Sequence, residues 1–109
     1  MDTPSERRKY PRSGIACRLR IELPNGRDLR TRSLNVSDGG VYFVTDEEVV
    51  DLGREMTVRL SVPRDTANTF FLEQFAAKAR VIRRDPSPDG YEGVGVALKF
   101  EKVLALDLL

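Results

Sequence analysis

Apolar and polar residues alternate along most of this chain with a period of two. The alternation covers residues 15–22, 55–62, 75–83 and 94–100, and a short apolar run covers residues 41–44. A period of two places every second side chain on the same face of a strand, so each segment predicts a strand with one buried face. No long stretch has the spacing of an amphipathic helix. The pattern therefore predicts an all-β protein.

Turn signals separate the predicted strands. Pro, Asn, Asp and Gly cluster at residues 24–26, 38–40 and 85–90, and polar loops cover residues 46–53 and 63–69. Residues 29–36 predict a return strand. Its apolar residues change from odd to even positions between Leu29 and Leu34, so we expect a bulge near residues 31–33. About six antiparallel strands in so short a chain favour a small barrel or sandwich, and closure into a barrel removes exposed edges.

The two ends of the chain depart from this pattern. Residues 1–12 are polar and charged, and Pro4 and Pro11 prevent a long helix there, so we expect a mobile arm. Residues 101–109 are rich in leucine and predict a short C-terminal helix or a strand extension. The expected organisation is a flexible basic arm over residues 1–12 followed by one β-barrel domain over residues 13–109.

The composition excludes most enzyme chemistry. With 109 residues, of which 40% are hydrophobic and 32% charged, the chain fits one globular domain. No apolar run reaches the roughly 18 residues of a membrane span, and the N-terminus has no signal sequence, so we expect a cytoplasmic protein without a membrane partner. One cysteine, Cys17, and the absence of histidine remove intrachain disulfides, cysteine zinc sites and the usual catalytic bases. We expect no catalytic residue, no metal and no cofactor.

The charge is distributed unevenly. The net charge is +1, but residues 1–32 carry nine Lys and Arg against four Asp and Glu, whereas residues 33–75 carry three against eight. Arginine outnumbers lysine fourteen to four, and the arginine fork suits phosphates and guanine edges better than the lysine point charge. An arginine-rich genome would give the same ratio. The basic first third of the chain nevertheless predicts an anionic partner.

The arm carries a basic motif. Arg7-Arg8-Lys9-Tyr10-Pro11-Arg12 places four cations within six residues, and Arg8 and Arg12 have the spacing RxxxR. A segment too short to pack can use these cations to reach an anionic ligand. The alternative is a basic terminus that is simply solvated, which is the commoner outcome for such a run.

A second motif begins at Asn35. The stretch Asn35-Val36-Ser37-Asp38-Gly39-Gly40 has the form (D/N)xSxxG, and residues two apart share one face of an extended chain. An amide beside a hydroxyl can read a purine edge, and the glycines allow the backbone to approach a ligand closely. The alternative is an ordinary hairpin turn, which Asp-Gly between hydrophobic runs also indicates.

Neither motif is specific alone, because the chain holds a second copy of each. Arg80 and Arg84 repeat RxxxR, and residues 85–90 repeat DxSxxG, but the two are fused and the prolines at 86 and 88 remove backbone donors. We interpret this copy as a strand end that runs into a loop. In the first copy 22 residues separate Arg12 from Asn35, enough for the arm to fold back over the barrel onto the second motif.

In this order and spacing the motifs resemble those of the PilZ domain family. Residues 79–83 and residues 93–96 before Phe100 also look like the last strands of that family. The resemblance covers roughly residues 6–100 and implies a six-stranded antiparallel β-barrel that binds the bacterial second messenger cyclic di-GMP without transforming it. The ligand-binding residues that this predicts are Arg7, Arg8, Arg12, Asn35, Ser37, Gly39 and Gly40.

The sequence departs from the family pattern in two places. Asn35 stands where the family more often has Asp, and a neutral amide lacks the charged acceptor for guanine N–H groups. The C-terminal helix that such domains often carry is reduced here to the short tail at residues 101–109.

Three functions compete. The first is a non-enzymatic cyclic di-GMP receptor that signals to a protein partner through ligand-induced ordering of its arm. The second is a degenerate barrel that acts only as a protein-interaction adaptor, and the third is a small nucleic-acid-binding barrel. The third needs a basic, aromatic sheet face, yet the middle third is acidic and only 7% of residues are aromatic. The intact motif residues favour the receptor. We expect this receptor to bind neither DNA nor RNA and to be a monomer or a weak dimer.

Overall fold

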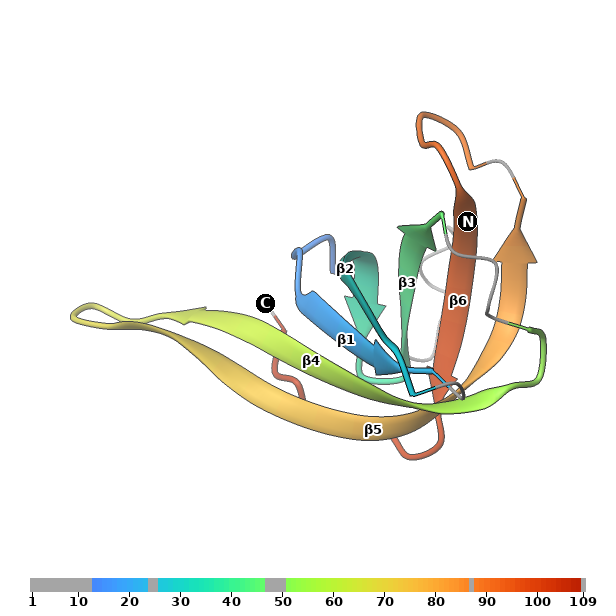
Figure 1. Ribbon diagram of the computed structural model, residues 1–109. Helices are drawn as coiled ribbons and strands as arrows, with labels where there is room; N and C mark the ends of the chain where they lie inside the picture. Colours follow the sequence, from blue (N-terminus) through green and yellow to red (C-terminus); the bar gives the residue numbers. More distant parts are fainter. Residues whose placement is uncertain (1–12, 24–25, 47–50, 87, 109) are drawn as a thin grey trace, which may run out of the picture.

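The computed structural model describes residues 13–23, 26–46, 51–86 and 88–108 (Figure 1). The strands are β1 Arg18–Glu22, β2 Asp28–Ser37, β3 Gly40–Thr45, β4 Glu55–Asp65, β5 Phe70–Asp85 and β6 Val94–Phe100. They close into an antiparallel barrel in the order β1-β2-β3-β6-β5-β4, with β4 paired back to β1. The described residues contain no helix and hence none that could cross a membrane. The prediction of a six-stranded antiparallel barrel is confirmed.

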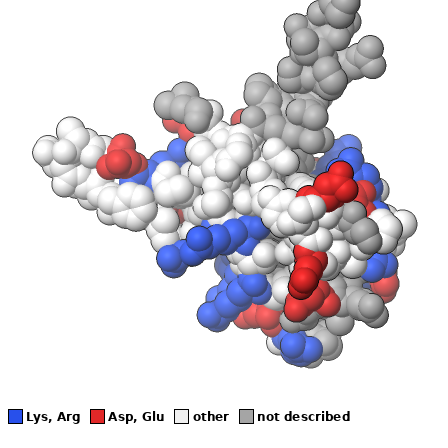
Figure 2. All heavy atoms as spheres, turned by 90° about the horizontal axis from the view of Figure 1, so that it is seen from above, with Lys and Arg blue, Asp and Glu red and all other residues white. Residues whose placement is uncertain are grey.

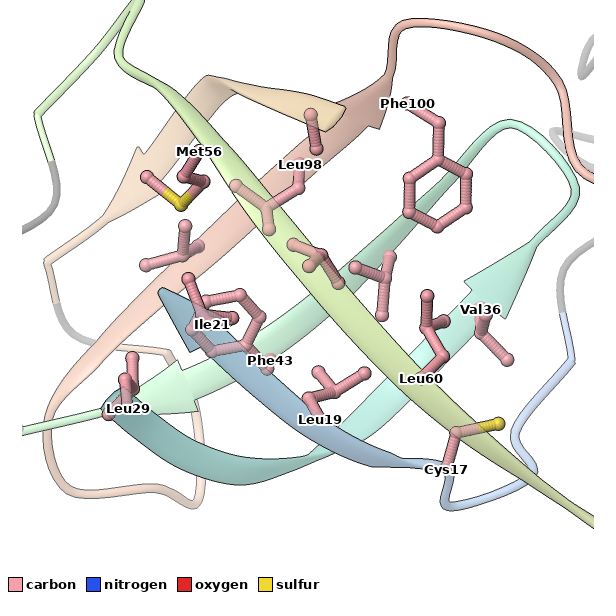
Figure 3. Close-up of a cluster of buried hydrophobic side chains, with 14 of the residues drawn as sticks. Cys17, Leu19, Ile21, Leu29, Val36, Phe43, Met56, Leu60, Leu98 and Phe100 are labelled. Carbon is pink, nitrogen blue, oxygen red and sulfur yellow. The ribbon is translucent and has the colours of Figure 1, made fainter. Parts of the chain in front are cut away.

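The alternating apolar side chains fill the barrel. Figure 3 shows them in the space that the strands enclose, among them Phe43, which is fully buried. The side chains with no exposed surface are Cys17, Ile21, Phe43, Val58, Leu60, Val62 and Leu106. Burial of this kind supplies most of the favourable free energy of folding. One continuous core therefore holds the strands that carry the second motif.

Two bulges interrupt the ladders. The first lies in β2 between Ser33 and Asn35, directly after the predicted position, and it returns Val36 to the core face. The second lies in β5 between Val81 and Arg83 and was not predicted. It leaves Ile82 on the surface at 56% exposure. An extra residue on one strand re-aims its neighbours, so both bulges change which side chains face outward.

The predicted loop at residues 63–69 was wrong. β4 continues to Asp65 and β5 starts at Phe70, so only a four-residue connection remains, and the hairpin extends far beyond the other strands (Figure 1). Pro63 is accommodated because β1 pairs with β4 only as far as Ser61, which leaves no third strand beside the proline.

The C-terminal segment is neither a helix nor a strand, so that prediction was also wrong. Residues 101–108 follow an irregular path in which Leu106 is fully buried in the core. Arg64 of β4 donates hydrogen bonds to the carbonyl groups of Leu106 and Asp107, the latter at 2.8 Å. We call residues 101–108 the C-terminal strap. The predicted arm, residues 1–12, lies outside the described residues.

Candidate functional site

A groove of about 490 Å³ lies on the outer surface where β2 and β3 lie beside β6 and β5. This volume is within the range of small-ligand pockets. The groove is lined by residues that include Asn35, Ser37, Gly39, Gly40, Tyr42, Ile82, Arg83, Lys99, Glu101 and Val103. We call it the motif groove, because every residue of the predicted second motif except Asp38 contributes to its wall.

Asn35 and Ser37 both line the groove and are half-buried, whereas Val36 between them points into the core. The expected shared face of the two polar residues is therefore present. No described residue hydrogen-bonds to the side-chain amide of Asn35, so this amide is available to a ligand. The Ser37 hydroxyl accepts a hydrogen bond of 3.2 Å from the Gly39 amide and stabilises the turn that follows.

Gly40 has a structural role in addition to the predicted one. A Cβ atom at Gly40 would overlap the backbone oxygen of Leu98 on β6, so only glycine allows β3 and β6 to pair this closely. The Gly39 carbonyl accepts a hydrogen bond of 3.0 Å from the Phe100 amide. The turn of the second motif is thus fixed against the end of β6.

Asp38, a position that the motif leaves variable, holds the C-terminal strap. Its backbone carbonyl accepts a hydrogen bond of 2.8 Å from the Leu104 amide. Its side-chain Oδ1 accepts another of 3.0 Å from the Leu106 amide. The motif turn is therefore connected both to the groove wall and to the C-terminal strap.

Tyr42, Arg83 and Asp85 form a cluster at the groove that sequence reasoning missed. The Tyr42 hydroxyl donates a hydrogen bond of 2.9 Å to Asp85 Oδ2, and Arg83 Nε lies 3.3 Å from Asp85 Oδ1. The Arg83 guanidinium carbon lies 5.6 Å from the centre of the Tyr42 ring. Burial, followed by the bond to Asp85, raises the pKa of Tyr42, so this hydroxyl stays protonated as a donor. The only sequence signal was an aromatic residue two positions after Gly40.

The groove has a mixed electrostatic character. Arg83 and Lys99 contribute positive charge and Glu101 contributes negative charge, while the exposed side chains of Ile82 and Val103 add apolar surface. Within the described part of the chain, no group of acidic or thiol side chains could hold a metal ion. The groove therefore suits a ligand with both anionic groups and flat apolar faces.

The predicted arginines Arg7, Arg8 and Arg12 lie outside the described residues. The chain enters the described region at Ser13, whose amide donates a hydrogen bond of 2.7 Å to the Val36 carbonyl. The Val36 amide donates one of 2.9 Å to the Ser13 carbonyl in return. Because Val36 lies between Asn35 and Ser37, the residue that follows the first motif pairs with the centre of the second.

The second copy of the motifs lies elsewhere. β5 ends at Asp85, as expected for a strand that runs into a loop, and neither Arg80 nor Arg84 lines the groove. Arg80 donates to the Gly53 carbonyl at 3.3 Å and pairs with Glu55 at 3.4 Å. Asp85 is the exception, because it contacts Tyr42 at the groove.

Comparison with known proteins agrees with this fold. The chain superposes on the structure of Bacillus subtilis inhibitor of motility (MotI/DgrA) with a TM-score of 0.76 at 22% identity, covering 96% of this chain and 50% of that one. It thus spans half the length of that protein. It also superposes on the PilZ domain with c-di-GMP of YcgR from Escherichia coli, with a TM-score of 0.55 at 16% identity over 88% of this chain and 79% of the other.

The sequence itself identifies the family. No curated protein matches the chain. The family model of the PilZ domain matches residues 6–107, which is nearly the whole chain. The protein therefore belongs to the PilZ domain family.

Proposed function

We propose that this protein binds cyclic di-GMP in the motif groove and acts as a non-enzymatic receptor in the bacterial cytoplasm. The observation that carries the proposal is the pair of hydrogen bonds between Ser13 and Val36. They tether the arm at the groove, so that Arg12 is one residue and Arg8 five residues from the tether. Five residues of extended chain span at most about 18 Å, which is enough to cross a groove of this size. Family membership and the likeness to the YcgR domain, which was solved with c-di-GMP, support the same ligand.

The chemistry of the groove fits this ligand. Arg8 and Arg12, with Arg7 beside them, would pair with guanine O6 and N7 or with phosphate. The free amide of Asn35 and the hydroxyl of Ser37 would contact a guanine edge. Arg83 and Lys99 line the same groove and would add two cations for the phosphates. No bond in the ligand needs to break, and the described residues include no histidine or reactive thiol to break one.

Ordering of the arm would carry the signal. A ligand that bridges the arm to Asn35 and Ser37 would create a surface that exists only in the bound state, and a protein partner could recognise it. Amide hydrogen exchange over residues 5–14 tests this step. We expect protection to rise when cyclic di-GMP is added, and equal, strong protection in both states would contradict the switch.

Isothermal titration calorimetry on the full chain tests the binding itself. We expect saturable binding of cyclic di-GMP and much weaker binding of cyclic di-AMP, which has the same phosphates but lacks the guanine edge that arginine reads. Absence of binding to cyclic di-GMP would reject the receptor and leave the alternative, an adaptor with a PilZ fold that does not bind the nucleotide.

A further inference from the structure

Five arginines project from the outer surface of neighbouring strands, away from the motif groove. On β1 and β2, Arg18 lies directly opposite Arg32, and Arg20 lies directly opposite Arg30. On the other side of β1, Arg20 lies opposite Arg59 of β4. We call these five residues the arginine face. Figure 2 shows basic side chains projecting from the molecule beside the extended hairpin.

The positive charge of this face is only partly neutralised. Arg20 pairs with Asp28 at 2.8 Å, and Arg59 pairs with Glu22 at 3.3 Å. None of the residues that the structure describes pairs with the other three arginines, which are all exposed: Arg18, Arg30 and Arg32. Like charges directly opposite each other on a sheet are destabilising. The free protein therefore holds a charge arrangement that an anionic partner would relieve.

The arginine face is a hollow surface. A depression of about 560 Å³ is lined by the five arginines together with Leu19, Thr31, Ser61 and Gln74. Adjacent strands are about 4.8 Å apart, and residues two apart along a strand are separated by about 7 Å, so the guanidinium groups form a compact two-dimensional array. The depression shares no lining residue with the motif groove, and its lining includes no aromatic side chain.

The same face of the sheet continues along the hairpin to an exposed aromatic residue. Because alternate residues of a strand share a face, Leu72 and Phe70 lie on the side of β5 that also carries Gln74. Phe70 is 66% exposed. Arginine and aromatic side chains are the residues most enriched in the energetic centres of protein interfaces. Such a surface is typical of a protein contact.

We propose that the arginine face binds an acidic segment of a protein partner, with Phe70 as an apolar anchor beside it. Arginine forks pair bidentately with carboxylates, and an extended acidic segment would match the array. Nucleic acid fits less well, because single strands bind on aromatic stacking platforms and none lies among these arginines. The proposal concerns the protein partner to which the proposed receptor would signal, but it does not require that cyclic di-GMP binds.

Fluorescence anisotropy with the full chain tests it, using a labelled glutamate-rich peptide that contains leucines. The variants are the double substitution Arg18→Ser with Arg32→Ser, and Phe70→Ser. The matched control is Arg54→Ser with Arg84→Ser, which removes the same charge from exposed positions outside the face. We expect the first double variant to bind the peptide about tenfold more weakly, Phe70→Ser to bind it several-fold more weakly, and the control to bind like the wild type.

Two results would overturn the proposal. One is equal weakening in both double variants, which would mean that only net charge matters. The other is that an oligothymidine or phosphatidylglycerol vesicles bind more tightly than the peptide, and that this binding is lost in the Arg18 and Arg32 double variant. That result would assign the face to nucleic acid or to a membrane. Calorimetry with cyclic di-GMP on the same variants keeps the two proposals apart, because that titration should be unchanged.

Discussion

The hydroxyl of Tyr42 on β3 reaches Asp85 on β5 at 2.9 Å, across the intervening strand β6. The side chain passes over Gly95, where a Cβ atom would overlap the Tyr42 hydroxyl. The absence of a side chain at this glycine therefore allows two strands that do not pair with each other to make a direct contact. Tyr42 lines the motif groove, so the geometry of the groove depends on a residue outside both motifs.

The first prediction concerns Gly95→Ala. The added methyl group displaces Tyr42 and breaks the bond to Asp85, so we expect a loss of about 1.5–3 kcal/mol in the free energy of unfolding, measured with urea. Tyr42→Phe removes the hydrogen bond without the clash and should lose less. If Gly95→Ala is as stable as the wild type, Tyr42 does not need the space above this glycine.

The second prediction concerns the arm. If Arg8 and Arg12 each supply a charge-assisted contact to the ligand, Arg8→Ala or Arg12→Ala should weaken cyclic di-GMP binding by roughly 1.5–3 kcal/mol. Calorimetry measures the loss, and thermal unfolding without ligand should be unchanged. Arg84→Ala is the matched control, because Arg84 belongs to the second RxxxR copy and lies outside the groove. Equal affinity of Arg12→Ala and the control would remove the arginines from the site.

The third prediction concerns the C-terminal strap. Leu106 is fully buried, so Leu106→Ala should cost about 2–5 kcal/mol of unfolding free energy. Asp38→Ala removes the acceptor for the Leu106 amide and should cost about 1–3 kcal/mol. Asp38→Asn, which keeps a carbonyl oxygen, is the control and should lose less. Equal losses in Asp38→Ala and Asp38→Asn would mean that the hydrogen bond does not hold the strap.

The fourth prediction concerns pH. Burial raises the pKa of the Cys17 thiol, although its hydrogen bond with Ser33 acts in the opposite direction. Above about pH 8.5 the unfolded chain releases this proton while the folded chain keeps it. The free energy of unfolding should therefore fall as the pH rises from about 8.5 through the folded-state pKa, by at most about 1.4 kcal/mol per pH unit.

Urea unfolding between about pH 8 and pH 10 checks this pH dependence. Cys17→Ala should be less stable than the wild type at neutral pH, because the deletion leaves a small cavity in the core. It should nevertheless lose less stability as the pH rises, since it has no thiol to ionise. Identical slopes in the two proteins would show that Cys17 does not contribute to the loss at high pH.

The strands were predictable because each depends mainly on local alternation. Leu19 and Ile21, for example, have polar neighbours on both sides, and a strand that faces a core is the natural result. The length of the β4–β5 hairpin was not predictable. Pro63 and Asp65 are turn-forming residues in sequence, but pairing with β5 over the whole hairpin overrides that local preference.

The site was predictable only in part, for the same physical reason. Asn35 and Ser37 are two residues apart on one strand, so their shared face follows from spacing. The contact between Tyr42 and Asp85 requires the strand order β3-β6-β5 and a glycine in the middle strand, neither of which local spacing contains. The strap likewise depends on Asp38 meeting a segment far along the chain.

The arginine face was not predicted from the sequence, for a related reason. The exposed positions of Arg18 and Arg20 follow from alternation, but the register that places Arg32 and Arg30 opposite them arises only when the strands pair. The acidic residues of the middle third, which counted against a basic sheet face, do not line this face in the described part of the chain. Charge totals along a sequence therefore did not predict charge on one surface.

The last prediction is that Arg32→Thr stabilises the protein. Arg18 and Arg32 are directly opposite each other, and removing one of two like charges on facing strands should raise the unfolding free energy by about 0.2–1 kcal/mol. Threonine also has a high strand propensity. The gain should shrink as salt screens the repulsion.

Arg84→Thr is the control, because Arg84 faces Val96 and should gain less. A loss of stability in Arg32→Thr at low salt would mean that the two arginines do not repel each other. A gain accompanied by weaker binding of the acidic peptide would mean that the face trades folding stability for partner recognition.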